Sequence, residues 1–204
     1  MKKLTIIGAS GHGKVVASIA LLNGYDEIEF LDDNEAIVAC GNYPVIGKSK
    51  LALKIENDIF VAIGNCQIRK KIMERLADRN MPVLIHPNAT VAEGVLIGKG
   101  TVVVAGAVIN SDAIIGKGGI VNTCSSVGHD YTIGDYVHVA PGAHVCGTSQ
   151  IGNVTWIGAG TIVSNNVLVC NNCMIGAGTV IIKDLKESGT YIGTPAKLVK
   201  TNGI

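Results

Sequence analysis

Residues 127–156 read VGHDYT IGDYVH VAPGAH VCGTSQ IGNVTW, five consecutive hexads that each begin with Val or Ile. The rhythm extends in both directions, because every sixth residue from Ile85 to Ile181 is Ile or Val without an insertion. A period of six matches neither the helical period of about 3.6 residues nor the alternation of a plain strand. It is typical of a solenoid in which a short strand and a turn repeat, with one branched aliphatic side chain pointing inward each time.

The other positions of the hexads also follow a pattern. Glycine recurs directly after the aliphatic residue, and a small residue often stands four positions after it. We expect the aliphatic residue to fill the interior, the small residue to let neighbouring coils approach, and the glycine to relieve the backbone at the corners. The glycines directly after the aliphatic residue are Gly98, Gly116, Gly128, Gly134, Gly152, Gly158 and Gly176. If three hexads form one coil of a triangular prism, residues 18 apart in the sequence stack on each other.

Residues 1–84 have a different pattern, in which strand and helix signals alternate. Short apolar strands are predicted at residues 4–7, 29–31 and 59–63, and helices at about 14–22 and 67–78. This order indicates a small parallel sheet of the nucleotide-binding type. We therefore predict two domains, an α/β domain over residues 1–84 and a repeat domain with a C-terminal tail over 85–204.

Composition narrows the class of protein. The chain has 204 residues, 48% of them hydrophobic and only 4% aromatic, with 26 glycines, which suits narrow strand layers and many tight turns. The formal net charge is only +1, so the charge gives no reason to expect a nucleic-acid partner. No stretch has the length of a membrane span and no signal-peptide pattern follows the N-terminus, so we expect a cytoplasmic protein.

Cys170 and Cys173 have the spacing of half a zinc site. A structural zinc ion needs two further ligands, and none of the other four cysteines lies 18 residues from either of them. Both cysteines occupy hexad positions at which other hexads have small residues. We therefore expect reduced thiols that fill space, and no metal.

The hexads resemble those of the left-handed parallel β-helix acyltransferases, the hexapeptide-repeat family. The tail sequence from Gly193 to Lys197, GTPAK, is similar to that family's usual C-terminal signature. The turn GASGHG at residues 8–13, the pair Asp32-Asp33 and the sequence AIGN at 62–65 narrow the resemblance to bacterial sugar acetyltransferases that act on a UDP-linked amino sugar, and to their sialic acid O-acetyltransferase relatives. The resemblance implies a homotrimer that uses acetyl-CoA, with active sites between neighbouring prisms.

His129 and Asp130 are the candidate catalytic pair. Acetyl transfer needs a base that removes a proton from the acceptor, and a neutral imidazole suits this near pH 7. An adjacent carboxylate can orient the ring and raise its basicity. The resemblance implies that His129 is the general base and Asp130 the residue that tunes it. From the residues alone, a solvated histidine beside a solvated aspartate in a turn fits equally well.

Four residues are candidates for the acetyl-CoA site. Gly147 lies 18 residues after His129, so it should stack over it and leave room and a backbone N–H beside the base. The resemblance assigns His138, Gly147, Ala159 and Ala177 to acetyl-CoA, whereas ordinary repeat packing explains the two alanines equally well. His138 and His144 should lie on different faces of the prism, where they cannot bind one metal ion within a chain.

The N-terminal turn is a candidate phosphate site, because a glycine-rich turn between strand and helix presents backbone N–H groups and a helix N-terminus. Its glycines depart from the dinucleotide pattern G-x-G-x-x-G. The resemblance implies that the UDP-sugar contacts Ser10, Gly11, His12, Asp32, Asp33 and Gly64. Turn chemistry is the alternative for the two aspartates. Arg69, Lys70, Lys71 and Arg75 are expected on a solvated helix face.

The resemblance, taken with these candidate residues, implies an acetyl-CoA-dependent enzyme without a metal that N-acetylates a UDP-linked 4-amino sugar. The amine attacks the thioester directly while His129 accepts its proton. One alternative is a sialic acid O-acetyltransferase, since a hydroxyl acceptor can use the same base. A second alternative is a hexapeptide prism that is noncatalytic or depends on a metal.

Overall fold

The structure is a computed structural model that describes residues 1–201, so the last three residues of the predicted repeat domain lie outside the described part. Its N-terminal part is a five-stranded sheet in the order β3-β4-β2-β1-β5, parallel except for β3. The predicted strands and helices are all present, whereas β3 and β4 were not predicted. The elements are β1 (Lys3–Ile7), α1 (Gly11–Leu22), β2 (Glu27–Leu31), β3 (Ala39–Cys40), β4 (Tyr43–Gly47), the 3-10 helix η1 (Ser49–Leu53), β5 (Asp58–Val61) and α2 (Cys66–Arg75).

From Leu84 onward the chain winds into a prism with three parallel sheets, which we name after one strand of each. The β15 face holds β6 (Leu84–Ile85), β9 (Val102–Val103), β12 (Ile120–Val121), β15 (His138–Val139), β18 (Trp156–Ile157), β21 (Met174–Ile175), β23 (Gly189–Ile192) and β24 (Lys197–Thr201). The β13 face holds β7 (Thr90–Val91), β10 (Val108–Ile109), β13 (Ser126–Val127), β16 (His144–Val145), β19 (Ile162–Val163) and β22 (Val180–Ile181). The β14 face holds β8 (Leu96–Ile97), β11 (Ile114–Ile115), β14 (Thr132–Ile133), β17 (Gln150–Ile151) and β20 (Leu168–Val169).

The register of these sheets is 18 residues per coil, as the sequence predicted. Val127 pairs with Val145 on the next coil, and Ile133 pairs with Ile151. The second residue of each paired strand is the aliphatic of the hexad, and the aliphatics from Val103 to Ile181 form one buried core inside the prism. The expected fold, a left-handed parallel β-helix preceded by a small α/β sheet, is therefore confirmed.

The glycines that follow the aliphatic residue have a different role from the one expected. They do not adopt positive φ, but a Cβ added to Gly116 would lie 2.6 Å from the backbone nitrogen of Asp135 on the next coil. These glycines therefore let the backbones of successive coils approach closely. The left-handed corner conformation occurs two residues later, at glycines such as Gly142 (φ 64°) and also at Asp130 (φ 53°) and Tyr136 (φ 59°).

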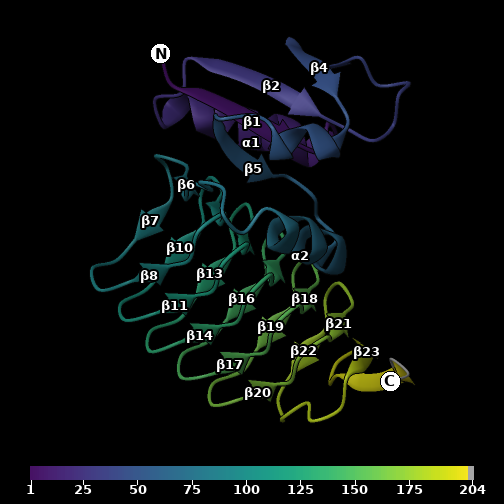
Figure 1. Cartoon of the computed structure of the whole chain (residues 1–204). Helices are drawn as coiled ribbons and strands as arrows, with labels where there is room; N and C mark the ends of the chain where they lie inside the picture. The colour runs from purple at the N-terminus through teal and green to yellow at the C-terminus, as the bar shows by residue number, and fades with distance from the viewer. Residues whose placement is uncertain (202–204) are drawn as a thin grey trace.

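The N-terminal sheet packs on the upper part of the β15 face (Figure 1). Leu84, Val102 and Ile120 point outward from that face, and each is at most 1% exposed because α1 and the sheet cover it. Helix α2 covers the next coils, where Met73 packs with Tyr136 and Val154. The cover ends lower on the face, since Met174 is 45% exposed.

The tail after Ile181 adds two strands to the lower end of the β15 face. β23 pairs with β21 in parallel, and β24 runs antiparallel beside β23. Thr194-Pro195, within the predicted GTPAK signature, is a cis peptide bond between these strands. Among residues 1–201, neither helix is long and apolar enough to span a membrane.

The two kinds of glycine predict different responses to substitution. Gly116→Ala should lower the free energy of unfolding by about 2 kcal/mol, because the new methyl group overlaps the next coil. Gly142→Asn should cost less than about 1 kcal/mol, because an added Cβ meets nothing within 4 Å and Asn tolerates positive φ. Urea unfolding of both variants measures the difference, and equal losses would contradict the steric role given to Gly116.

Candidate active site

His129 and Asp130 lie at the corner that joins β13 to β14, which we call the His129 edge. Nδ1 of His129 is 2.7 Å from a carboxylate oxygen of Asp130, and both side chains are 63% exposed. A neutral imidazole in this contact donates its Nδ1 proton to the carboxylate, which leaves the lone pair on Nε2. The left-handed backbone of Asp130 belongs to the general corner geometry, so the coil itself places the carboxylate beside the ring.

Gly147 stacks on His129, as predicted from the 18-residue register. A Cβ added to Gly147 would lie 2.9 Å from Nε2 of His129, and the next residue, Thr148, donates its backbone N–H to the carbonyl of His129. Within residues 1–201 the backbone N–H of Gly147 makes no hydrogen bond. The Nε2 atom of His129 and residue Gly147 therefore lie next to each other on this edge.

The other predicted acetyl-CoA residues lie elsewhere on the prism. Ala159 and Ala177 stack at the corner between the β15 and β13 faces, which we call the Ala159 edge. The His129 edge follows strand β13 and the Ala159 edge precedes strand β19, so the two edges are the opposite margins of the β13 face. A single chain does not bring these residues to Gly147.

Ser10, Gly11 and His12 lie where β1 passes into α1, at the carboxyl end of β1. Gly64 follows β5, which neighbours β1 on the side away from β2. In an open parallel sheet, ligands bind in the crevice outside the carboxyl ends of strands where the strand order reverses. The four residues therefore border the expected position of this crevice, between the carboxyl ends of β1 and β5. Gly13 makes the sharp turn possible, because a Cβ there would lie 2.2 Å from the carbonyl oxygen of Gly8.

Asp32 and Asp33 lie at the carboxyl end of β2, beside this crevice, and both carboxylates have partners within the chain. Asp32 accepts backbone N–H bonds from Ala9 and Asn34, and Asp33 accepts bonds from the N–H and hydroxyl of Ser49. Asp32 also lines a cavity of about 290 Å³ with apolar residues of β4. The aspartates thus organise the loops around the crevice.

His138 lies where the crevice meets the β-helix and is only 5% exposed. Its Nδ1 is 3.4 Å from the carbonyl of Gly64, and its Nε2 is 3.1 Å from the amide nitrogen of Asn122, one coil above. A neutral ring satisfies both contacts, with Nδ1–H as donor and Nε2 as acceptor. The sequence analysis did not identify Asn122, because an asparagine at a corner has many structural uses.

Arg69 is wrongly predicted as a solvated residue. Its side chain is 1% exposed and donates to carbonyls of Ile63 and Gly64 in the crevice wall and of Gly118 and Tyr136 in the β-helix. The signal in the sequence is its position on the apolar stripe of α2, with Cys66 and Met73. The exposed Lys71 and Arg75 conform to the prediction.

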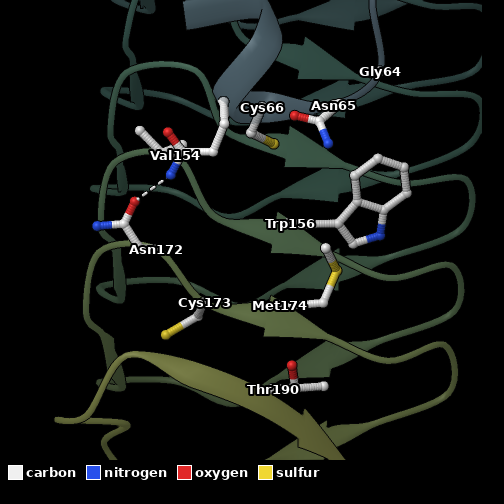
Figure 2. Close-up of a pocket in the computed structure, with 10 residues that line it drawn as sticks. Gly64, Asn65, Cys66, Val154, Trp156, Asn172, Cys173, Met174 and Thr190 are labelled. Atoms are coloured by element: carbon white, nitrogen blue, oxygen red, sulfur yellow. Dashed lines mark hydrogen bonds between the residues drawn. The ribbon is translucent and has the colours of Figure 1, made fainter. Parts of the chain in front are cut away.

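A cavity of about 630 Å³ adjoins the crevice below Gly64. Figure 2 shows Trp156 and Met174, both from the β15 face, beneath the Gly64–Asn65 turn that begins α2. The ring of Trp156 lies 4.1 Å from that of His138, centroid to centroid. The crevice therefore continues down the β15 face along an aromatic and largely apolar wall.

The candidate metal ligands of residues 1–201 do not meet in groups larger than two. His138 and His144 lie on different faces, on β15 and β16, as expected. The sulfur atoms of Cys170 and Cys173 are 3.5 Å apart, and both thiols are free. Within residues 1–201 no group of three or more His, Cys, Asp or Glu side chains is arranged to hold a metal ion.

The burial of two histidines leads us to expect that the free energy of unfolding falls in mild acid. Burial, together with the positive charge of Arg69, lowers the pKa of His12 to about 4 and that of His138 to about 3. In the unfolded chain both rings titrate near about 6.5, so below this pH the unfolded state binds more protons and the free energy of unfolding falls. Each ring contributes up to about 1.4 kcal/mol per pH unit between its two pKa values.

Urea unfolding between pH 7 and pH 5 checks this slope. His138→Gln should reduce the pH dependence by up to one proton relative to the wild type. An identical slope in the variant and the wild type would show that His138 is not held neutral.

Known proteins resemble the chain in both of its parts. Residues 3–76 match the family described as the PglD N-terminal domain, and residues 148–183 match the bacterial transferase hexapeptide repeats. The UDP-N-acetylbacillosamine N-acetyltransferase of Bacillus subtilis is 33% identical over 115 residues, a stretch that spans 52% of this chain and 52% of that protein.

Several solved structures are similar over nearly the whole chain. The acetyltransferase domain of PglB from Neisseria gonorrhoeae is 42% identical with a TM-score of 0.94, and the match covers 98% of this chain and 100% of that one. The same domain has been solved with acetyl coenzyme A. A histidine-to-asparagine variant of perosamine N-acetyltransferase from Caulobacter crescentus, solved with CoA and GDP-perosamine, is 32% identical with a TM-score of 0.92 and covers 98% and 97% of the two chains.

These likenesses extend through the α/β sheet, the crevice and the β-helix with its tail. The chain therefore belongs to the family of hexapeptide-repeat sugar acetyltransferases that carry a PglD-type N-terminal domain.

Proposed function

We propose that this protein transfers the acetyl group of acetyl-CoA to the amine of a UDP-linked 4-amino sugar, with His129 as the general base. The observation that carries the proposal is the contact of His129 with Asp130. Of the five histidines, all within the described residues, His129 is the one whose ring contacts a carboxylate. Its Nε2 is free to take a proton, whereas both nitrogens of His138 are engaged.

The reaction follows from this arrangement. The sugar amine attacks the carbonyl carbon of the thioester, and Nε2 of His129 takes the proton that the nitrogen loses. The carbonyl oxygen becomes negative, and the free N–H of Gly147 can donate to it. The carbon–sulfur bond then breaks, and the leaving thiolate of coenzyme A receives the proton from His129. Asp130 holds the ring in the required tautomer and stabilises its charged form.

The nucleotide-sugar is proposed to bind across the carboxyl ends of the N-terminal strands. The first turn of α1, at Gly11 and His12, presents backbone N–H groups and the positive end of the helix dipole to the diphosphate. Ser10 and Gly64 border this position, and Asp32 and Asp33 lie on the side of β2. From there the sugar reaches the β15 face at His138 and Trp156.

We propose a homotrimer because the predicted acetyl-CoA residues are far apart on one prism, with Gly147 on the His129 edge, Ala159 and Ala177 on the Ala159 edge, and His138 on the β15 face. If the His129 edge of one protomer faces the Ala159 edge of the next, then His129 and Gly147 meet His138, Ala159 and Ala177 of the neighbour. A closed ring of three such contacts gives three equal sites. The free thiols suit a reducing compartment, and we keep the cytoplasm as the expected location.

The choice of acceptor is tested by an assay of coenzyme A release. The B. subtilis relative is named for a UDP-sugar, whereas the C. crescentus relative was solved with a GDP-sugar. We expect turnover with a UDP-4-amino-4,6-dideoxy sugar, and at least tenfold lower kcat/KM with GDP-perosamine and with free or CMP-linked sialic acid. A preference for sialic acid would favour O-acetylation, and a preference for the GDP-sugar would overturn the assignment of UDP.

The shared active site is tested by mixing two inactive variants. His129→Asn removes the base and should lower kcat by about 10²–10⁴-fold. Gly11→Asp places a negative charge at the proposed diphosphate position, at a residue around which an added Cβ meets nothing within 4 Å. Coexpression should restore about a quarter of wild-type activity, since three quarters of randomly mixed trimers have one intact site of three.

One control makes this result specific. His144→Asn should keep full activity, because His144 lies outside the proposed site and contacts Ser126 rather than a carboxylate. No activity in the mixed trimers, with each variant folded and assembled, would place His129 and the crevice of one site in the same protomer.

A further inference from the structure

Arg69 is a fully buried cation that is bound by carbonyl groups. Nε donates to the carbonyl of Gly118 at 2.7 Å, and Nη2 donates to that of Tyr136 at 2.8 Å. Nη1 donates to the carbonyls of Ile63 and Gly64 at 2.7 and 2.8 Å. Within residues 1–201 no carboxylate lies within salt-bridge distance of this guanidinium.

These carbonyls belong to two separate parts of the molecule. Ile63 and Gly64 form the wall of the crevice at the end of β5, whereas Gly118 and Tyr136 are corner residues of two successive coils. One side chain thus joins the crevice wall to the β-helix. The planar guanidinium can do so because its donors diverge in a fixed fork, which an ammonium group lacks.

A buried charge without a counter-ion is a costly way to join two domains. Apolar residues of similar volume generally fill such a position at lower cost in stability. Arg69 does lie among apolar side chains of α2 and the β-helix, where packing alone would hold the helix. What packing would not provide is a fixed position for the Gly64 carbonyl.

That carbonyl also faces His138, at 3.4 Å from Nδ1. The groups around the guanidinium include Cys66, whose sulfur is 3.7 Å from Nη2, Tyr136, and the rings of His12 and His138, which stack at 6.4 Å. After burial, the charge of Arg69 is the largest cause that lowers the pKa of each histidine. Arg69 therefore acts on the crevice through both geometry and charge.

We infer that Arg69 is a positioning residue, which sets the crevice wall at Ile63 and Gly64 against His138 so that the nucleotide-sugar is held at the β15 face. The inference rests on the proposed function for the identity of the ligand. A residue with only a structural role would lower stability and affect both substrates equally. A positioning residue affects the nucleotide-sugar selectively.

The test uses the full chain with Arg69→Lys, Arg69→Met and the control Arg75→Lys, which alters an exposed arginine on the same helix. Lysine keeps the charge but cannot bind four diverging carbonyls. Arg69→Lys should raise the KM for the UDP-amino sugar about tenfold and change the KM for acetyl-CoA less than threefold, because the lost bonds are charge-assisted. Arg75→Lys should change neither.

A second measurement tests the effect of the Arg69 charge on the pKa of His138. In ¹⁵N NMR titrations, Arg69→Met should move the pKa of His138 upward from about 3, whereas Arg69→Lys and Arg75→Lys should not. This readout needs no substrate, so it remains informative if the wild-type enzyme turns over no UDP-amino sugar, a result that would refute the proposed function alone. If Arg69→Met does not fold, the KM values of Arg69→Lys decide. Equal changes in both KM values, or wild-type values for folded Arg69→Lys, would overturn the inference.

Discussion

Close backbone contact between successive coils is the constraint on which the rest of the structure depends. Coils can stack at this spacing because glycine follows many of the inward aliphatics, where a Cβ would overlap the next coil. Stacking fixes an 18-residue register, and the register places Gly147 on His129. The same corner geometry gives Asp130 its left-handed backbone and sets its carboxylate beside the imidazole. The geometry of the repeat thus positions the groups that surround the candidate base.

The prism also explains why the site needs two parts. Its outward surface offers a polar pair on one edge and small residues on another, at opposite margins of the β13 face. The α/β sheet supplies a crevice, and it is anchored on the β15 face by apolar packing and by Arg69. In the account proposed here, a neighbouring protomer brings the base to the sugar held in this crevice.

The sequence alone predicted the repeat, its register and the order of the N-terminal elements, because each depends on local periodicity. It also predicted the stacking of Gly147 on His129 and the separation of His138 from His144. It assigned the corner conformation to the glycines directly after the aliphatics, whereas positive φ occurs two residues later, because residue type alone does not determine φ. Asn122 and the hydrogen-bond partners of Arg69 could not be identified, because they lie in coils and loops that only the tertiary structure brings together. The charge of Arg69 suggested a solvent-exposed side chain, whereas its position on the apolar stripe of α2 indicated correctly that it is buried.

The most direct test of the central claim is a crystal structure of the assembled protein with coenzyme A and a UDP-amino sugar. The account predicts that the sulfur of coenzyme A lies within about 4 Å of Nε2 of His129 from one protomer, at the distance of reacting groups in a near-attack arrangement. The same coenzyme A should lie along the Ala159 edge of the neighbour, with the sugar amine between the sulfur and that neighbour's His138. A coenzyme A bound wholly within one protomer, or a sulfur remote from His129, would contradict it.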